Sequence, residues 1–251
     1  MGISADPRRA CWAAAVSTRS VVLGRVALEI RSVLGAGVTR VAIDGLDGAG
    51  KTCFANELAS CFSDVEVIRA SIDGFHHPRA VRYSRGKDSP EGFFLDSFNY
   101  PLLKSYLLDP LSTGGSGRYR VAAFDHRTDR AVDSPLLTAN PPSILVFDGI
   151  FSHRPDVVHY WDYSIFLAVD RRESLRRCNQ RDAVRHAVDD PRAAVHQRYT
   201  KGQDIYLRSC KPQAAASIVI NNDDLAAPYV VARQQHAPML AVGARGEREG
   251  S

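Results

Sequence analysis

Apolar residues follow two different spacings along this chain, and each spacing predicts a different kind of element. From residue 20 onward, Val22, Val26, Ile30 and Val33 recur at intervals typical of one helical face, and the glycines after them end the helix. Short apolar runs predict buried strands instead. The expected strands cover residues 38–43, 65–70, 119–124, 143–147, 163–169 and 217–220. Further helices are expected at residues 51–61, 98–108, 171–187 and 191–207.

Strands and helices alternate through most of the chain. That order predicts an α/β fold with right-handed crossovers and a mostly parallel central sheet that has helices on both faces. In such sheets, ligands bind at the carboxyl ends of the strands. We interpret residues 1–19 as an N-terminal extension, residues 20–225 as one domain, and residues 226–251 as a tail with a composition typical of disorder.

Composition narrows the function classes. The chain has 251 residues, 45% of them apolar, which is enough to bury a sizeable core. Its formal net charge of +4 is modest and its arginines are spread out, so no nucleic-acid partner is expected. No apolar stretch reaches the length of a membrane span, so no membrane partner is expected either. The five cysteines form no C-x-x-C pair, which is typical of reduced thiols in a cytoplasmic protein.

A phosphate-binding loop follows the first predicted strand. Residues 45–52 complete the pattern G-x-x-x-x-G-K-[ST], with an apolar run before it and a helical stretch after it. In this pattern backbone N–H groups cradle a polyphosphate, while Lys51 reaches its terminal phosphates and Thr52 ligates Mg²⁺. A glycine-rich turn without a ligand is the alternative. The residues expected to bind the nucleotide are Gly45, Asp47, Gly48, Ala49, Gly50, Lys51, Thr52 and Cys53.

Three aspartates follow predicted strands, at the positions where the fold rule expects ligands. Asp148 fits a carboxylate that holds Mg²⁺ or its water shell, since this ion takes few protein ligands. Asp73 fits a general base for an attacking hydroxyl. Asp125 is the third. Because Asp73 and Asp148 each precede a glycine, simple turn aspartates are the alternative.

Two arginines and two histidines complete the candidate chemistry. Arg177 and Arg181 lie four residues apart, hence on one helical face, where they could neutralise a transferring phosphoryl group from a mobile lid. A solvated basic helix is the competing interpretation. His76 and His77 have no further ligand at metal-binding spacing, so substrate contact or surface exposure is expected for them.

Taken in order, several segments of the chain resemble the uridine kinase-like branch of P-loop kinases, which includes phosphoribulokinase and one type of pantothenate kinase. The resemblance covers roughly residues 38–222. It rests on Ile43-Asp44-Gly45 leading into the loop and on these segments: 71–76 (SIDGFH), 90–98 with Pro90-Glu91-Gly92 and Asp96-Ser97-Phe98, 107–111, 124–125, 147–150 (FDGI), 177–182 and 216–220.

The resemblance implies a three-layer P-loop NTPase fold with a helical lid, and it implies roles for individual residues. Asp73 would be the base for a sugar hydroxyl, Asp96 would hold ribose hydroxyls, Phe124 would line the base pocket, and Arg181 would belong to the lid. Uridine kinases usually carry tyrosines where His76 and Phe124 stand, a glutamate where Asp148 stands, and lid arginines where His186 and Val188 stand. We assign His76, His126 and Arg127 to acceptor recognition.

The function expected from these residues is a Mg²⁺-dependent transfer of the γ-phosphoryl group of ATP or GTP to a primary hydroxyl. The leading acceptor is the 5′-hydroxyl of uridine or cytidine, which implies a role in pyrimidine salvage. A pantothenate-like or phosphosugar acceptor is the second interpretation. The third is a nucleotide-binding regulator that transfers nothing. Assembly into a homo-oligomer is left open.

Overall fold

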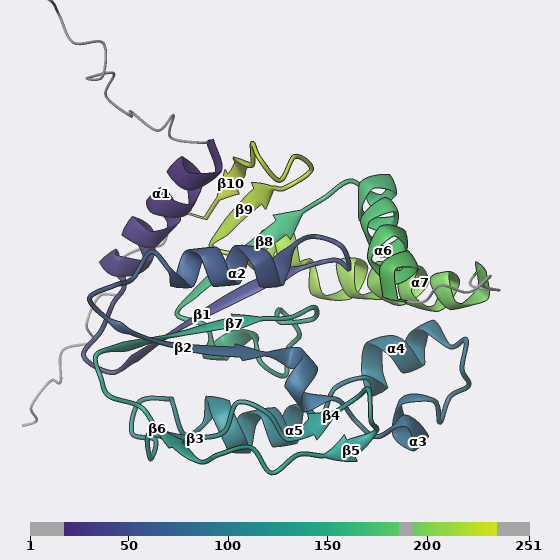
Figure 1. The fold of residues 1–251 in the computed structure, drawn as a ribbon, viewed down its shortest axis with the longest axis horizontal. Helices are drawn as coiled ribbons and strands as arrows, with labels where there is room; N and C mark the ends of the chain where they lie inside the picture. Colours follow the sequence, from purple (N-terminus) through teal and green to yellow (C-terminus); the bar gives the residue numbers. More distant parts are fainter. Residues whose placement is uncertain (1–17, 186–192, 235–251) are drawn as a thin grey trace, which may run out of the picture.

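A six-stranded sheet forms the centre of the protein (Figure 1). The computed structural model describes residues 18–185 and 193–234. The strand order is β10-β9-β8-β1-β7-β2, in which β10 alone runs antiparallel to its neighbour. The strands are β1 (Val38–Gly45), β2 (Glu66–Ser71), β7 (Ser143–Asp148), β8 (Tyr163–Ala168), β9 (Ile218–Asn221) and β10 (Tyr229–Arg233).

Side chains of the central strands alternate between two cores, as the pleat of a sheet requires. Ile144 and Val146 of β7 pack with α1 (Thr18–Ser32) and α2 (Lys51–Ala59) on one face. Leu145 and Phe147 of the same strand join the core on the other face. This second core is covered by α4 (Pro90–Asp96), α5 (Tyr100–Leu103), the π-helical segment η2 (Lys104–Leu108) and α7 (Ala193–Cys210). The sheet and the helices on its two faces therefore fix the positions of the segments that follow the strands.

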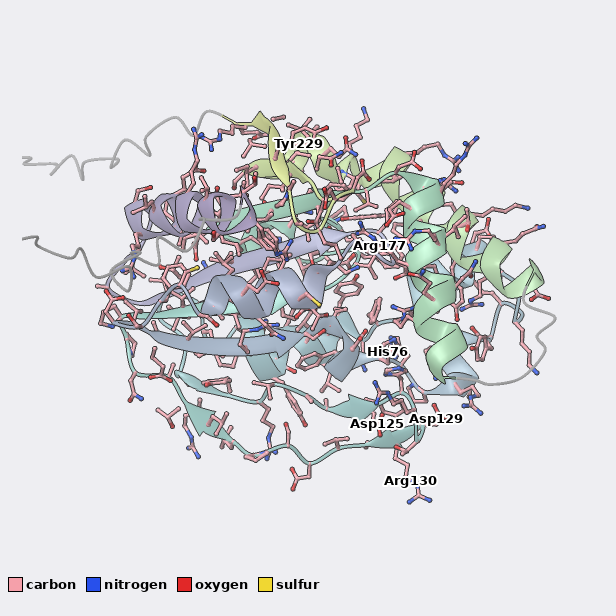
Figure 2. All side chains as sticks on the ribbon, turned by 45° about the horizontal axis from the view of Figure 1, so that its top comes forward. His76, Asp125, Asp129, Arg130, Arg177 and Tyr229 are labelled. Atoms are coloured by element: carbon pink, nitrogen blue, oxygen red, sulfur yellow. The ribbon has the colours of Figure 1, made fainter. Side chains whose placement is uncertain are left out.

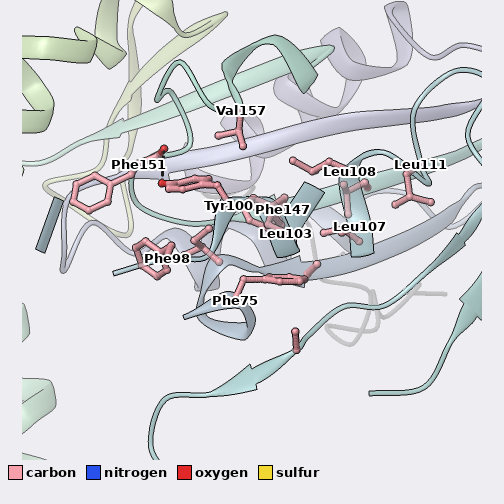
Figure 3. Packing of buried hydrophobic residues seen from close by; sticks show 14 of the residues in the cluster. Phe75, Phe98, Tyr100, Leu103, Leu107, Leu108, Leu111, Phe147, Phe151 and Val157 are labelled. Atoms are coloured by element: carbon pink, nitrogen blue, oxygen red, sulfur yellow. Dashed lines mark hydrogen bonds between the residues drawn. The ribbon is translucent and has the colours of Figure 1, made fainter. Parts of the chain in front are cut away.

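The second core is rich in aromatic rings, and it fixes the segment after β2. Phe75, from the short helix η1 (Ile72–Phe75), belongs to the same buried cluster as Phe98, Tyr100 and Phe151, all of which are labelled in Figure 3. The hydroxyl of Tyr100 donates to the carbonyl of Phe151 at 3.4 Å. Because the fully buried ring of Phe75 anchors η1, the residues on either side of Phe75 have defined positions after the carboxyl end of β2.

Short strands and helices form part of the connections between the main elements. Two-stranded sheets pair β3 (Arg118–Tyr119) with β6 (Leu137–Thr138) and β4 (Phe124–Asp125) with β5 (Arg130–Ala131). The remaining helices are α3 (Arg79–Arg82), η3 (Val158–Tyr160), α6 (Arg171–Arg185) and α8 (Pro212–Ala215). None of the helices in the described ranges combines the length and the apolar character that crossing a bilayer demands.

The α/β architecture with a mostly parallel sheet is confirmed, and five of the six predicted strands lie in the central sheet. The strand predicted at residues 119–124 is wrong. Only its end residues, Tyr119 and Phe124, lie in strands, and these belong to two separate two-stranded sheets. Between them, Arg120 N donates to Tyr106 O of η2 and Ala123 N donates to Gly74 O of η1. Asp125 therefore does not follow a strand of the parallel sheet.

The C-terminal part of the domain extends further than the sequence indicated. Part of the tail predicted at residues 226–251 is the strand β10, which pairs with β9 through Tyr229 and Arg233. Val230 supplies the physical reason, since it packs against the core under α1. Residues 235–251 lie outside the described part, as do residues 1–17 of the predicted extension.

Candidate active site

The loop between β1 and α2 has the backbone conformation of a phosphate cradle. Gly48 and Gly50 have φ of 73° and 84°, a left-handed region that residues with a Cβ rarely adopt. A Cβ on Gly48 would lie 2.5 Å from the carbonyl oxygen of Ser174 on α6. The first helical hydrogen bond of α2 joins Phe54 N to Gly50 O, so the amides of residues 51–53 precede the helical ladder. They form the positive end of the helix dipole, which favours an anion.

Polar contacts hold this loop from several elements. Lys51 Nζ donates to the carbonyls of Gly45 and Leu46, each at 2.9 Å, which keeps the ammonium over the loop. The side-chain amide of Asn222, at the end of β9, donates to Ala49 O at 2.8 Å. Ser174 Oγ donates to the carbonyl of Asp47. All of these contacts end on carbonyl oxygens, so none of them occupies an amide of the loop. We call the side of the loop that carries these carbonyl groups its outer side.

Asp44 is a fully buried carboxylate directly before the loop. It accepts the amide of Gly45 at 2.6 Å, Nδ1 of His153 at 2.7 Å and the hydroxyl of Tyr206. Nε2 of His153 lies 3.0 Å from Oγ of Ser164, which continues the buried network. Burial, together with the neighbouring Asp44, raises the pKa of Tyr206 well above its usual value, so its hydroxyl stays a donor. This network fixes the backbone at which the loop begins.

Thr52 and Asp148 lie side by side, as a shared Mg²⁺ site requires. Thr52 Oγ1 donates to Oδ2 of Asp148 at 2.7 Å. The other carboxylate oxygen accepts Nη2 of Arg69 at 2.8 Å, and Asp148 is only 2% exposed. No group of three or more metal-ligating side chains occurs within the described ranges. A hydroxyl with one adjacent carboxylate nonetheless fits Mg²⁺, since this ion keeps several waters and takes phosphate oxygens as further ligands.

Asp73 lies at the carboxyl end of the sheet, two strands away from the loop. In register, Ile43 of β1 and Ser71 of β2 both pair with Asp148 of β7. Because neighbouring strands lie about 4.8 Å apart, the strand leading to Asp73 is about 10 Å from the strand leading to the loop. Asp73 is exposed at the start of η1. Loop, metal pair and exposed carboxylate thus occupy three successive strand ends.

His76, which is labelled in Figure 2, belongs to a cluster of aromatic rings and contacts the backbone of Asp73. Its ring centroid lies 4.5 Å from that of Phe98 and 4.4 Å from that of His126. Burial lowers the pKa of His76 to about 4, so the imidazole is neutral at pH 7. Nδ1 lies 3.1 Å from the carbonyl oxygen of Asp73. Because a carbonyl only accepts, Nδ1 carries the proton, which leaves Nε2 as a hydrogen-bond acceptor.

The other residues predicted to contact an acceptor differ in their burial and in their hydrogen-bond partners. Asp96 accepts Nε of Arg85 at 2.8 Å, and Phe124 is buried in β4. Arg127 is exposed, and its amide donates to Oδ1 of Asp125 at 2.9 Å. That bond, with a second from Thr128, lowers the pKa of Asp125. Asp125 is therefore the last residue of β4, and its side chain accepts bonds from the turn that leads to β5. Its predicted place at the end of a strand of the parallel sheet is wrong.

The two arginines of the predicted lid lie on α6, with Arg177 near the end of the sheet (Figure 2). Arg177 donates to the carbonyls of Gly48 at 3.3 Å and of Asn222 at 3.0 Å, and to Glu173 Oε1 at 2.7 Å. Its guanidinium therefore contacts the outer side of the loop. Arg181 is exposed one turn further on. Their catalytic role stays a prediction, and positions 186 and 188, compared above with lid arginines, lie outside the described residues.

Sequence reasoning gave no structural role to three groups that support this site: Asp44, which was noted only as part of the segment before the loop, Arg69 and Asn222. Arg69 lies within the predicted strand 65–70, and Asp44 directly follows the predicted strand 38–43. A charged side chain next to buried apolar positions was therefore the available signal. Cys53 is exposed in the first turn of α2, and its contact with a nucleotide stays a prediction.

Comparisons with known proteins cover most of this chain. The model described as the phosphoribulokinase/uridine kinase family matches residues 41–222. A pantothenate kinase from Rhodopseudomonas palustris is 26% identical over 185 residues, covering 65% of this chain but only 56% of that protein. A uridine kinase from Ureaplasma urealyticum is 22% identical over 209 residues, covering 76% of this chain and 92% of that protein. The solved structure of a "possible uridine kinase" from Bacillus stearothermophilus superposes with a TM-score of 0.62 at 20% identity, covering 78% of this chain and 96% of that one, and supports the fold.

Proposed function

The chain belongs to the phosphoribulokinase/uridine kinase family, and from that premise we propose that this kinase transfers the γ-phosphoryl group of ATP or GTP to a hydroxyl of a small molecule. One observation supports the proposal most: three groups lie at the ends of three neighbouring strands, β1, β7 and β2. These groups are the glycine loop with Lys51, the Thr52–Asp148 pair and the exposed Asp73. A nucleotide-binding regulator needs the loop but has no use for an exposed carboxylate facing the place where a second substrate would sit.

On the donor side, catalysis would depend on the positioning of the phosphates and on the positive charges around them. Loop amides and Lys51 would hold the β- and γ-phosphates, and Arg177 would keep the loop in shape from outside. Thr52 and Asp148 would hold Mg²⁺, which neutralises phosphate charge when bound. Because phosphoryl transfer has a loose transition state, fixed electrostatics of this kind supplies most of the catalysis.

On the acceptor side, Asp73 would take the proton of the attacking hydroxyl. The hydroxyl oxygen forms its bond to the γ-phosphorus while the bond from that phosphorus to the β–γ bridging oxygen breaks, and the nucleoside diphosphate leaves. The carboxylate accepts the proton, so the charges balance. Asp73 is accessible to a substrate, which supports this role.

We propose a pyrimidine ribonucleoside as the acceptor to test first, with its 5′-hydroxyl as the reacting group. Nε2 of His76 would accept a hydrogen bond from the substrate, and Asp96 would bind ribose hydroxyls. A pantothenate-like acceptor is the second candidate, since a pantothenate kinase is among the relatives and His76 replaces the usual tyrosine.

The test measures the release of ADP with a coupled assay. Uridine, cytidine, pantothenate and phosphosugars are supplied in turn as the acceptor. We expect one class to stimulate ADP release. Asp73→Asn should keep nucleotide affinity and lose about 100-fold or more of the transfer rate. Near wild-type transfer by Asp73→Asn contradicts the base assignment, and nucleotide binding without stimulation by any acceptor favours the regulator.

A further inference from the structure

Helix α7 contacts both halves of the proposed site through one face. Arg198, Gly202 and Tyr206 lie four residues apart, so they line one side of the helix over about 12 Å. At one end of this stripe, Tyr206 contacts Asp44, the residue directly before the phosphate loop. The other end contacts residues 77–89, the segment between η1 and α4 that includes α3, which we call the acceptor loop.

At the phosphate loop, α7 donates two hydrogen bonds. The hydroxyl of Tyr206 donates to the buried carboxylate of Asp44, which itself accepts the amide of Gly45. Nε2 of Gln203 donates to Oδ2 of Asp47 at 3.0 Å. The helix therefore contacts the residue before the loop and a residue within it.

At the acceptor loop, α7 contributes Arg198, which is only 3% exposed. Its guanidinium donates to the carbonyls of Arg82 at 2.9 Å and of Gly86 and Lys87, both at 3.1 Å. It also lies over the ring of Tyr83, 4.8 Å from the centroid. Nε of Arg198 has no hydrogen-bond partner in the described part of the chain. Moving the loop away would leave a buried cation without acceptors, so loop and helix are expected to move together.

Between these ends, α7 is held tightly against α4. A Cβ on Gly202 would lie 2.7 Å from the ring of Phe93 and 2.8 Å from the carbonyl of Pro90. The acceptor loop in turn fixes the backbone beside His76, because Nε of Arg82 donates to the carbonyl of His77 at 2.8 Å. A displacement of α7 is thus transmitted to the acceptor residues.

We propose that Arg198 and Tyr206 are positioning residues, which make α7 a stiff connection through which nucleotide binding orders the acceptor loop. This inference rests on the proposed function, because it requires the glycine loop to bind a nucleotide. It explains how a kinase could prepare its acceptor side only when the phosphoryl donor is in place.

The experiment is hydrogen–deuterium exchange of the full chain with and without Mg²⁺ and the non-hydrolysable ATP analogue AMP-PNP. In the wild type, we expect the analogue to slow amide exchange in residues 79–89 by about fivefold or more, a typical size for coupling between sites. Arg198→Met and Tyr206→Phe should each reduce this slowing to about twofold or less. Arg198→Lys, which keeps the charge and some donors, should restore part of it.

Arg208→Met is the matched control, since Arg208 is exposed on the same helix and forms no hydrogen bond or ion pair among the described residues. It should behave like the wild type. If Arg198→Met does not fold, Tyr206→Phe decides the question, because it removes one hydroxyl and keeps the ring. Binding of AMP-PNP with unchanged slowing in Tyr206→Phe overturns the inference and leaves the proposed function standing. No binding to folded wild type overturns both.

Discussion

Gly48→Ala tests whether α6 holds the phosphate loop in shape. Gly48 has φ of 73°, and an alanine in this region costs about 1–2 kcal/mol. Its Cβ would also lie 2.5 Å from the carbonyl oxygen of Ser174 and 3.2 Å from Sγ of Cys178. Relieving an overpacked contact of this kind costs typically about 1–3 kcal/mol. We therefore expect the free energy of unfolding to fall by about 3 kcal/mol.

Gly117→Ala is the matched control, because Gly117 has φ of 69° and a Cβ there meets no atom within 4 Å. It should cost about 1 kcal/mol, and the change in unfolded-chain entropy is the same in both variants. Urea unfolding measures the difference, and calorimetry should show nucleotide affinity at least about tenfold weaker in Gly48→Ala alone. Equal stability and equal affinity in the two variants would refute the idea that α6 shapes the loop.

Three further predictions concern single groups. Asp148→Asn should lower turnover at saturating Mg²⁺ by about 100-fold or more, measured by Mg²⁺ titration, and an unchanged dependence on Mg²⁺ would contradict its role. Arg177→Met should raise KM for the nucleotide more than it lowers kcat, since Arg177 contacts the outer side of the loop; a loss confined to kcat would instead favour action on the transferring phosphoryl group. His76 has a pKa of about 4 when folded and about 6.5 when unfolded, so the unfolded chain binds the proton first and stability rises with pH between these values. Urea midpoints should therefore fall from pH 7 to pH 5, and less so in His76→Asn; an identical fall in that variant would show that another group is responsible.

The sequence predicted best those features that are determined by residues close together in the chain. The loop motif, the strand before it and the helix after it are contiguous, and the structure has β1 and α2 at those positions. Asp148 could also be placed, because it ends a continuous apolar run that forms a central strand. In these cases the period of the apolar residues and the special φ of glycine carry the information.

The partners of these residues could not be predicted, because they come from distant parts of the chain. Arg69 and Asp148 are 79 residues apart, and Tyr206 and Asp44 are 162 residues apart. A single sequence does not show which buried charge pairs with which. The prediction for residues 119–124 was wrong for a related reason. This short apolar run packs against η1 and leads into a hairpin, and an apolar run alone does not distinguish such a segment from a strand of the central sheet.

The central claim is that the loop ending in Lys51 and Thr52 binds a nucleoside triphosphate, and calorimetry tests it most directly. Titration of Mg²⁺ with ATP or GTP into the wild type should give saturable heat, with a dissociation constant between about 1 μM and 1 mM. Lys51→Ala, with unchanged circular dichroism, should bind at least about tenfold more weakly. Folded wild-type protein that gives no heat with either nucleotide, or Lys51→Ala that binds as tightly as the wild type, would contradict the account.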